Sequence, residues 1–232
     1  MILYICQCNA CKLWNNFLDQ RFWQHYIIFD SFFHSIFSCV KPYQIIIADG
    51  GKDLQPVINQ FSNRLNVIRL ACPEVGQVLQ RNHAHKYLNK NIQLVIHLDD
   101  DITLEHDSLR KMIMFWNEES QKSALPLAGA SFNIKDVPEL RSSILRNLFF
   151  LQTKPAGHVS IAGYAAPLTP TETNMQTSWL LGGATAWSRD VIEKHQHPIN
   201  YPTRWAICED LIYSYLHITR KCPHFKRNED TL

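Results

Sequence analysis

Residues 93–107 read Gln-Leu-Val-Ile-His-Leu-Asp-Asp-Asp-Ile-Thr-Leu-Glu-His-Asp, an apolar run that ends in three consecutive acids. Residues 94–98 suit a strand buried on both faces, as in a parallel sheet. Because burying unpaired charge is costly, Asp99, Asp100 and Asp101 are expected where this strand leaves the sheet. Open α/β sheets bind ligands at that edge, and clustered carboxylates suit Mg²⁺ or Mn²⁺. A solvated acidic turn that caps the next helix is the alternative.

The composition is that of a globular protein. The chain has 232 residues, 46% hydrophobic and 19% charged, which is most simply one domain with a full core. The net charge of +2 predicts no nucleic-acid partner. Residues 1–6 lack the basic region and cleavage site of a signal peptide. Residues 26–40 are too short and too polar to span a bilayer. We expect a core helix there, and an amphipathic surface helix is the alternative that would allow peripheral membrane association.

Cysteine usage indicates the compartment. Seven cysteines lie scattered along the chain, and with no secretory signal they predict reduced thiols in a cytoplasmic protein. Cys6, Cys8 and Cys11 are close enough to suggest zinc, but no second Cys/His pair at finger spacing accompanies them. We therefore expect them to pack in and after a first strand.

Four histidines occur as two closely spaced pairs. His83 and His85 are two residues apart, so a helix would place them on different faces and a shared metal is not expected. His195 and His197 could share a metal only in an extended segment. All four are expected to be surface or packing residues.

Strand and helix patterns alternate over the first half of the chain. Helices are expected at 54–61, 76–89 and after the acids, where Leu109, Met112, Ile113 and Trp116 share one helical face. Residues 13–40 suggest one or two further helices. The predicted strands are 2–7, 44–48, 66–70, 93–98 and 127–132. This alternation predicts a doubly wound parallel sheet with helices on both faces.

The second half has a different character. Residues 134–178 are rich in Pro and Gly and are expected to form strands and loops over one end of the sheet. Residues 178–187 should lead into a helix capped by Ser188. The helix predicted at 211–219 is apolar nearly all round, so we expect it to be buried. The tail from 221 is polar and should fray.

Other polar residues could take part in chemistry, and each has an ordinary structural explanation. Asp49 ends a strand beside glycines and could bind a base or ribose, although such turns are common. Arg81 could meet a phosphate or a uracil edge, or it could face solvent. The pair Glu209–Asp210 opens a helix, where a carboxylate can act as a general base or simply cap the helix. The pair Gly182–Gly183 would let a loop approach a substrate closely.

Several nucleotide and hydrolase signatures are missing from the sequence. It contains no Gly-x-Ser-x-Gly, no Gly-x-x-x-x-Gly-Lys-Ser/Thr and no Gly-x-Gly-x-x-Gly. These gaps weigh against classical hydrolases, P-loop NTPases and nicotinamide dehydrogenases.

The order of the motifs resembles the family 2 glycosyltransferases with a GT-A fold. The corresponding segments are the Asp-Gly-Gly turn at 46–51, the Gly-x-x-x-x-Arg-Asn helix at 76–82, Asp-x-Asp at 99–101, the Trp and Gly-Gly loop at 179–189, and Glu-Asp at 209–210. The resemblance covers roughly residues 2–220. It implies a single α/β domain with a Rossmann-like, mostly parallel central sheet flanked by helices and a small acceptor-side subregion.

The resemblance implies that residues 1–232 form a single glycosyltransferase domain with a donor-binding half and an acceptor-binding half. Residues 1–132 would bind the nucleotide sugar, residues 133–220 the acceptor, and 221–232 would be a tail. On the donor side, Asp49 and Arg81 would contact the nucleoside, and Asp99 or Asp100 the ribose or sugar. Asp101, together with Asp99, would ligate Mg²⁺ or Mn²⁺.

On the acceptor side, the resemblance implies an inverting transfer from a nucleotide-diphosphate sugar, expected to be a UDP-sugar. The acceptor would be a hydroxyl on a glycan, a lipid-linked molecule or another compound. Asp210 would be the general base beside Glu209, and Glu209, Trp179, Gly182 and Gly183 would shape the acceptor side.

The sequence also departs from the family pattern. Ala48 stands where the family often has an acid, and residues 9–41 match poorly. These departures leave two alternatives: a catalytically inactive nucleotide-sugar-binding protein on the same fold, or a nucleotidyltransferase. Nucleotidyltransferases usually carry a Gly-rich, basic loop after their first strand, and this sequence has no such loop.

Overall fold

A computed structural model describes residues 2–6, 40–50, 55–74, 76–99, 102–122, 126–135, 143–151, 156–168, 170, 173–199, 208–218 and 225–227. The strands are β1 (Ile2–Cys6), β2 (Gln44–Asp49), β3 (Val67–Ala71), β4 (Leu94–Asp99), β5 (Gly129–Ser131), β6 (Met175–Thr177), β7 (Ala184–Ser188) and β8 (Phe225–Arg227). The helices are α2 (Gln55–Phe61), α3 (Gln77–His85), α4 (Ser108–Lys122), α5 (Ile144–Leu148), α6 (Arg189–Lys194) and α7 (Glu209–Ile218).

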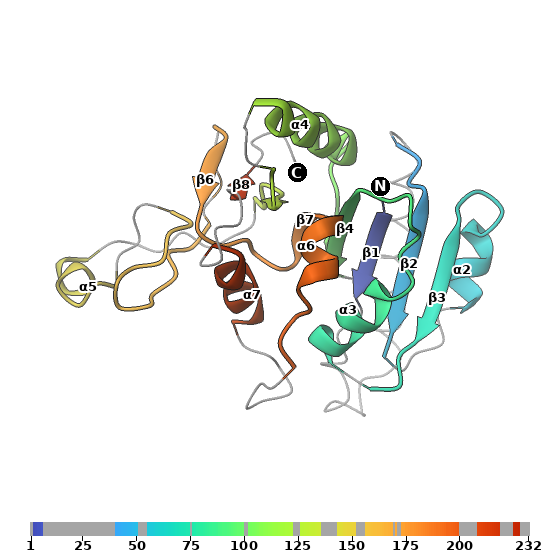
Figure 1. The fold of residues 1–232 in the computed structure, drawn as a ribbon, viewed down its shortest axis with the longest axis horizontal. Coiled ribbons are helices and arrows are strands. Elements are labelled where there is room, and N and C mark those ends of the chain that lie inside the picture. The colour runs from blue at the N-terminus through green and yellow to red at the C-terminus, as the bar shows by residue number, and fades with distance from the viewer. Residues whose placement is uncertain are drawn as a thin grey trace.

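The described strands form one mixed sheet in the order β3-β2-β1-β4-β7-β5-β8-β6 (Figure 1). The strands β3, β2, β1 and β4 run parallel to one another. Next in the sheet, β7 is antiparallel to β4 and to β5, β8 is parallel to β5, and β6 is antiparallel to β8. The sheet is therefore mostly parallel, as predicted.

The register brings the carboxyl ends of the parallel strands together. Cys6 at the end of β1 pairs with Ala48 on β2 and with Asp99 on β4. Asp49 follows Ala48 directly, so Asp49 and Asp99 lie at the same edge of the sheet. This is the edge at which open α/β sheets bind ligands.

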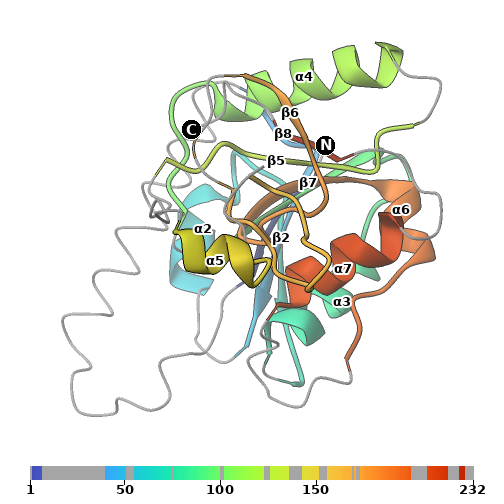
Figure 2. The same ribbon diagram turned by 90° about the vertical axis from the view of Figure 1, so that its left-hand side faces the viewer.

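Helices cover both faces of the sheet because the central strands are apolar on both sides. Leu94, Ile96 and Leu98 of β4 pack with α2 and α4, whereas Val95 packs on the opposite face, in the core that α3, α6 and α7 help to form. Figure 2 shows α4 on one side of the strands and α3, α6 and α7 on the other. The alternation follows from the two-residue period of a strand and gives the doubly wound arrangement.

The first-half elements agree with the sequence. The strands β1 to β4 and the helix α4 are found where predicted, and Leu109 and Met112 on α4 are buried as the periodicity requires. The helix α3 ends at His85 rather than at residue 89. The helices predicted within 13–40 lie outside the described residues, except for Val40 at the end of that range.

The helix after Ser188 is α6, and Ser188 caps it as predicted, because its side chain accepts the Val191 N–H. Residues 184–188, which end at this cap, form β7, a strand in the middle of the sheet.

Three predictions for the second half were wrong. The strand β8 lies within the tail that we expected to fray. The short helix α5 lies in the segment predicted as strands and loops. The helix α7 is not buried all round, because Ile212 and Tyr215 are 40% and 54% exposed. The strands β7 and β8 have no strong strand pattern of their own and form by pairing with their neighbours in the sheet.

One group of apolar side chains lies outside the core. On α5 and just after it, Ile144, Leu145, Leu148 and Phe149 are exposed, and Figure 1 shows that α5 projects from the body of the molecule. Within the described part of the chain, no helix combines the length and apolar character needed to cross a bilayer.

Candidate functional site

Asp99, the last residue of β4, contributes the first carboxylate of the candidate site. Its carboxylate accepts hydrogen bonds from Gln77 Nε2, at 3.2 Å to Oδ1 and 3.1 Å to Oδ2. Its backbone N–H donates to the Gly183 carbonyl at 2.9 Å. The strand thus presents a partly exposed carboxylate at the ligand-binding edge, and the side chain of Gln77 orients it.

Arg81 joins Asp99 to the second acidic site. Its side chain is 1% exposed, and its guanidinium forms ion pairs with Glu209 and, at 3.1 Å, with Asp99 Oδ1. The same guanidinium donates to the Gly182 carbonyl at 3.1 Å. The planar fork of Arg suits this use, since it can hold several oxygens at fixed angles. Arg81 therefore ties α3, the end of β4, the 182–183 turn and the start of α7 into one unit.

Glu209 is a buried, ionised carboxylate. Burial alone would raise its pKa, but the charge of Arg81 and the hydrogen bond from His197 outweigh burial and lower the pKa to about 2. His197 Nδ1 lies 3.2 Å from Glu209 Oε2. Two partners on different elements therefore fix the position of Glu209 at the first turn of α7.

Asp210 follows Glu209 but has a different environment. Its Oδ1 accepts the Leu211 N–H at 2.8 Å and its Oδ2 accepts the Gly182 N–H at 3.2 Å. Burial raises the pKa of Asp210 above its ordinary value, and the nearby Glu209 charge adds to this, although both N–H groups oppose it. Neighbouring carboxylates whose pKa values move in opposite directions can serve different chemical roles.

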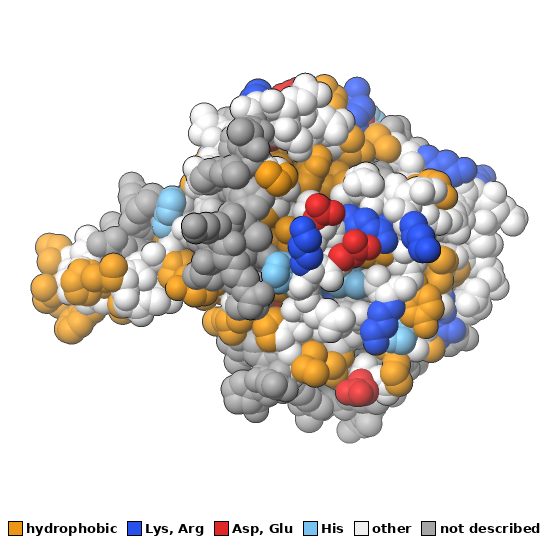
Figure 3. Space-filling view, in the orientation of Figure 1, with side chains coloured by type: hydrophobic (Ala, Val, Ile, Leu, Met, Phe, Trp, Pro, Cys, Tyr) orange, Lys and Arg blue, Asp and Glu red, His pale blue; other side chains and the backbone are white. Residues whose placement is uncertain are grey.

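The 182–183 turn lies against both acidic sites. A Cβ on Gly182 would come within 3.0 Å of Glu209 Oε1 and 3.1 Å of Asp210 Cβ, and one on Gly183 within 3.2 Å of Asp99 Oδ2. Glycine suits both positions because a Cβ would crowd the carboxylates, and the backbone can pass close to them. Figure 3 shows acidic and basic side chains side by side near the middle of one face of the molecule.

Asp49 lies at the same sheet edge with a partner of its own. It is buried, and Arg69 on β3 contacts its Oδ2 at 2.7 Å through Nη2 and 3.1 Å through Nε. The Asp49 carboxylate is therefore held in place at the end of β2, next to Ala48. Sequence reasoning missed Arg69, because nothing in a strand pattern marks a partly buried Arg as the partner of a residue 20 positions earlier in the chain.

Sequence comparison decides the family of this chain. The model of the family described as Glycosyl transferase family 2 matches residues 28–165, more than half of the chain. The chain belongs to glycosyl transferase family 2. The match includes β2, α3 and β4 and ends before α7, so it covers the Asp99 side of the site and not Glu209 or Asp210. No curated protein matches this glycosyl transferase family 2 chain.

Solved structures show the fold of this family 2 chain. S. aureus TarS 1–349 matches with a TM-score of 0.58 at 12% identity, covering 99% of this chain and 58% of TarS 1–349. Its complex with UDP gives 0.59 at 10% identity with the same coverage. Its complex with UDP-GlcNAc gives 0.57 at 11%, covering 99% and 56%. This chain thus spans little more than half the length of these structures. The predicted GT-A fold is confirmed.

The structure brings most of the predicted site residues of this family 2 chain together. Asp99, Arg81, Gly182, Gly183 and the pair Glu209–Asp210 converge, although they come from four separate segments. The alternative of a solvated Arg81 was wrong, because the side chain is buried and ion-paired. Asp100 and Asp101 lie outside the described residues.

Trp179 is buried three residues before the 182–183 turn. It is 8% exposed, and its indole N–H donates to the Ala166 carbonyl at 3.2 Å. In this structure its ring is a packing residue that anchors the start of the turn. Its role toward an acceptor in this family 2 chain stays a prediction.

Two of the four histidines expected at the surface or in packing lie in one buried group of rings. His85 and His197 converge with His97, a residue in the middle of β4, whereas His83 and His195 do not belong to this group. A polar ring inside an otherwise apolar strand needs a partner, so the position of His97 was the signal that could have predicted the group. The Cys8 and Cys11 positions lie outside the described residues, as does the Cys6 side chain.

Proposed function

We propose that this chain transfers a glycosyl group from a UDP-sugar to an acceptor hydroxyl with inversion at the anomeric carbon. One observation carries the proposal: buried Arg81 binds both Asp99 and Glu209. Through Arg81, the donor-side carboxylate of Asp99 is joined to Glu209 of the predicted catalytic pair, although the two acids are 110 residues apart in the chain. Membership of family 2 supports glycosyl transfer, and TarS, a protein of like fold, was crystallised with UDP and with UDP-GlcNAc.

In this proposal Asp210 is the general base. Its carboxylate takes the proton from the acceptor hydroxyl while that oxygen attacks the anomeric carbon and the bond to the UDP leaving group breaks. The raised pKa of Asp210 suits this role, because a more basic carboxylate accepts the proton more readily. The Gly182 N–H, at 3.2 Å, holds Asp210 Oδ2 in position.

Arg81 and Glu209 act as positioning residues. Glu209 stays ionised beside Arg81, so it is a poor proton acceptor and serves to hold the first turn of α7 in place. Arg81 in turn fixes Asp99, which we propose faces the ribose or sugar together with Asp100. A direct contact of Arg81 with the nucleoside remains part of the family expectation, as does a contact of Asp49 with the base.

A divalent cation, Mg²⁺ or Mn²⁺, is implied by the family. Asp99 offers hard carboxylate oxygens on a side chain that is 24% exposed, which fits such an ion, but these oxygens already accept from Arg81 and Gln77. Asp101 is therefore the better candidate for direct ligation, with Asp99 beside it. Such an ion would neutralise charge that develops on the departing diphosphate.

A thermal-shift screen of nucleotide sugars with and without Mn²⁺ tests this proposal. We expect UDP-sugars to raise the unfolding temperature only with the metal, and UMP, which lacks the diphosphate, to have little effect. The donor found in this way then serves in a transfer assay with Asp210→Asn. We expect this variant to bind the donor normally and to lose about 10²–10⁴-fold in kcat.

Two results would count against the proposal. If no nucleotide sugar shifts the unfolding temperature, the chain does not bind this class of donor. If donors bind but wild type and Asp210→Asn are equally inactive with every acceptor tested, the alternative of an inactive nucleotide-sugar-binding protein holds.

A further inference from the structure

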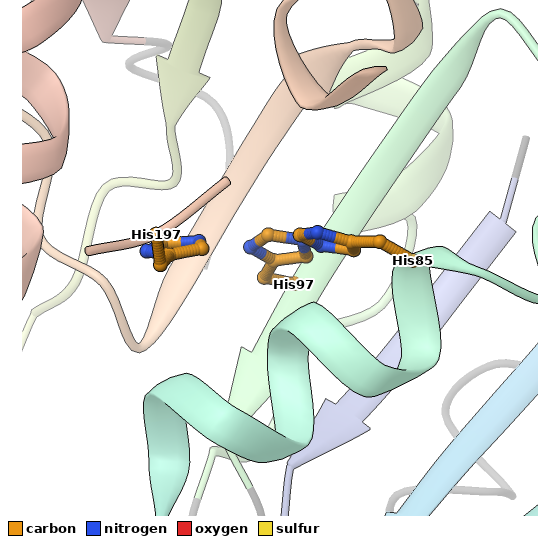
Figure 4. Close-up of side chains that lie close together, drawn as sticks. All are labelled: His85, His97 and His197. Carbon is orange, nitrogen blue, oxygen red and sulfur yellow. The ribbon is translucent and has the colours of Figure 1, made fainter. Parts of the chain in front are cut away.

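Three histidines form a compact group beneath the candidate site. His85 ends α3, His97 lies in β4, and His197 follows α6; His97 and His197 are buried and His85 is half-buried. Their ring centroids form a triangle with sides of 5.1, 5.9 and 6.1 Å. Figure 4 shows the three side chains turned toward one another from their separate elements.

The nitrogens in this group approach one another as ligands of one ion would. His85 Nε2 and His97 Nε2 are 3.0 Å apart, and one nitrogen from each of the three rings lies within 4.8 Å of the others. A tetrahedral Zn²⁺ with Zn–N bonds of about 2.0–2.1 Å would need nitrogens about 3.4 Å apart. The 3.0 Å between His85 Nε2 and His97 Nε2 is close to that spacing.

His197 has the surroundings of a metal ligand. Its Nδ1 lies 3.2 Å from Glu209 Oε2, and both of its ring nitrogens are buried without a well-aligned hydrogen bond in the described structure. A carboxylate on one ring nitrogen usually fixes the tautomer and orients the other nitrogen toward a metal. The ring also stacks on Tyr213, with centroids 3.7 Å apart, so its orientation is fixed.

The charge state of the group suits a cation. Burial lowers the pKa of His85, His97 and His197, and the charge of Arg81 lowers each of them further, so the rings are neutral near pH 7. Neutral imidazole is the form that ligates metals. Glu209, which is ion-paired with Arg81, is the carboxylate that lies beside His197 and would face the bound cation.

We infer that His85, His97 and His197 form a binding site for a transition-metal dication, with Zn²⁺ the best match for three imidazole ligands. The site is distinct from the carboxylates expected to bind Mg²⁺ or Mn²⁺, which are hard oxygen ligands. It would cross-link α3, β4 and the segment after α6. Asn82 on α3 already bonds the His197 backbone twice, at 2.8 and 2.9 Å, so the metal would reinforce an existing contact.

Metal titration of the chelator-treated full chain tests this inference. Saturating Mg²⁺ is present throughout, so that the acidic site is occupied. We expect one Co²⁺ to bind per chain with the intense visible absorption of a tetrahedral site, and Zn²⁺ to displace it. His85→Gln and His197→Gln should each weaken binding by more than about 100-fold, since even loss of an outer partner costs 10–100-fold.

Matched controls come from the neighbouring histidines. His83→Gln lies on the same helix as His85, and His195→Gln lies two residues from His197; both should bind Co²⁺ as wild type does. X-ray absorption of the Zn²⁺-loaded wild type needs no variant and should show scattering from three imidazoles. If wild type binds no stoichiometric Co²⁺, or if His85→Gln and the control His83→Gln bind equally, the group is a metal-free imidazole network and the inference is wrong.

Discussion

Replacing Arg81 tests the contact that joins the two halves of the site. Arg81→Met keeps the apolar stem and removes a guanidinium that binds Glu209, Asp99 Oδ1 at 3.1 Å and the Gly182 carbonyl at 3.1 Å. Glu209 is only 5% exposed, so it would be left as a buried charge without its cation. Removing one partner of a buried ion pair costs about 3–5 kcal/mol.

The contribution of Asp99 to this loss is smaller. Its side chain is 24% exposed, so water can solvate it once Arg81 is gone. Most of the loss should therefore come from Glu209, and Glu209→Gln made in the Arg81→Met background should recover part of it. A coupling of about 1–3 kcal/mol between the two changes is expected, as for residues in direct contact.

Urea denaturation followed by circular dichroism measures these free energies of unfolding. Arg110→Met is the matched control, because Arg110 is an exposed helix residue paired with Asp107 and should cost less than about 1 kcal/mol. If Arg81→Met costs no more than Arg110→Met, or if the Arg81 and Glu209 changes are additive, Arg81 does not hold the site together.

Two further predictions concern catalysis and the turn over the acids. Because burial and Glu209 raise the pKa of Asp210 above 3.8, the transfer rate should fall on acidification at a pH higher than an ordinary carboxyl would give. An acid limb at or below pH 3.8, with the fold intact by circular dichroism, would contradict this. Gly182→Ala should cost about 1–3 kcal/mol of stability and reduce transfer, since its Cβ would meet Glu209 and Asp210. Equal stability and activity for Gly182→Ala and wild type would refute the close packing.

Much of the fold followed from local patterns. The run 94–98 predicted β4 because a strand covered on both faces is apolar at most positions, here all except His97, and Leu109 and Met112 predicted the buried face of α4. In contrast, β7 is a central strand of the sequence Ala-Thr-Ala-Trp-Ser, which carries no strong pattern of its own. It is a strand because it pairs with β4 and β5, and such pairing is not visible in a single segment.

The site was predicted in part. The acids at 99–101 stood out because unpaired charges cannot continue a buried strand, and Glu209–Asp210 stood out as a pair of carboxylates that opens a helix. The sequence did not show that Arg81 is buried between them, because a helical Arg is usually solvated. Nor did it show that His97, His85 and His197 meet, since this depends on the crossing of three elements separated by up to 112 residues.

The metal-dependent binding of UDP tests the central claim most directly. Isothermal titration calorimetry of wild type and Asp101→Asn, each with and without Mn²⁺, gives the dissociation constants. We expect wild type to bind UDP far more tightly with Mn²⁺ than without it, and Asp101→Asn to lose this dependence while it keeps the wild-type unfolding temperature. If UDP binds Asp101→Asn with the same Mn²⁺ dependence as wild type, Asp101 is not the donor's metal ligand; if UDP does not bind wild type at all, this is not a UDP-sugar site.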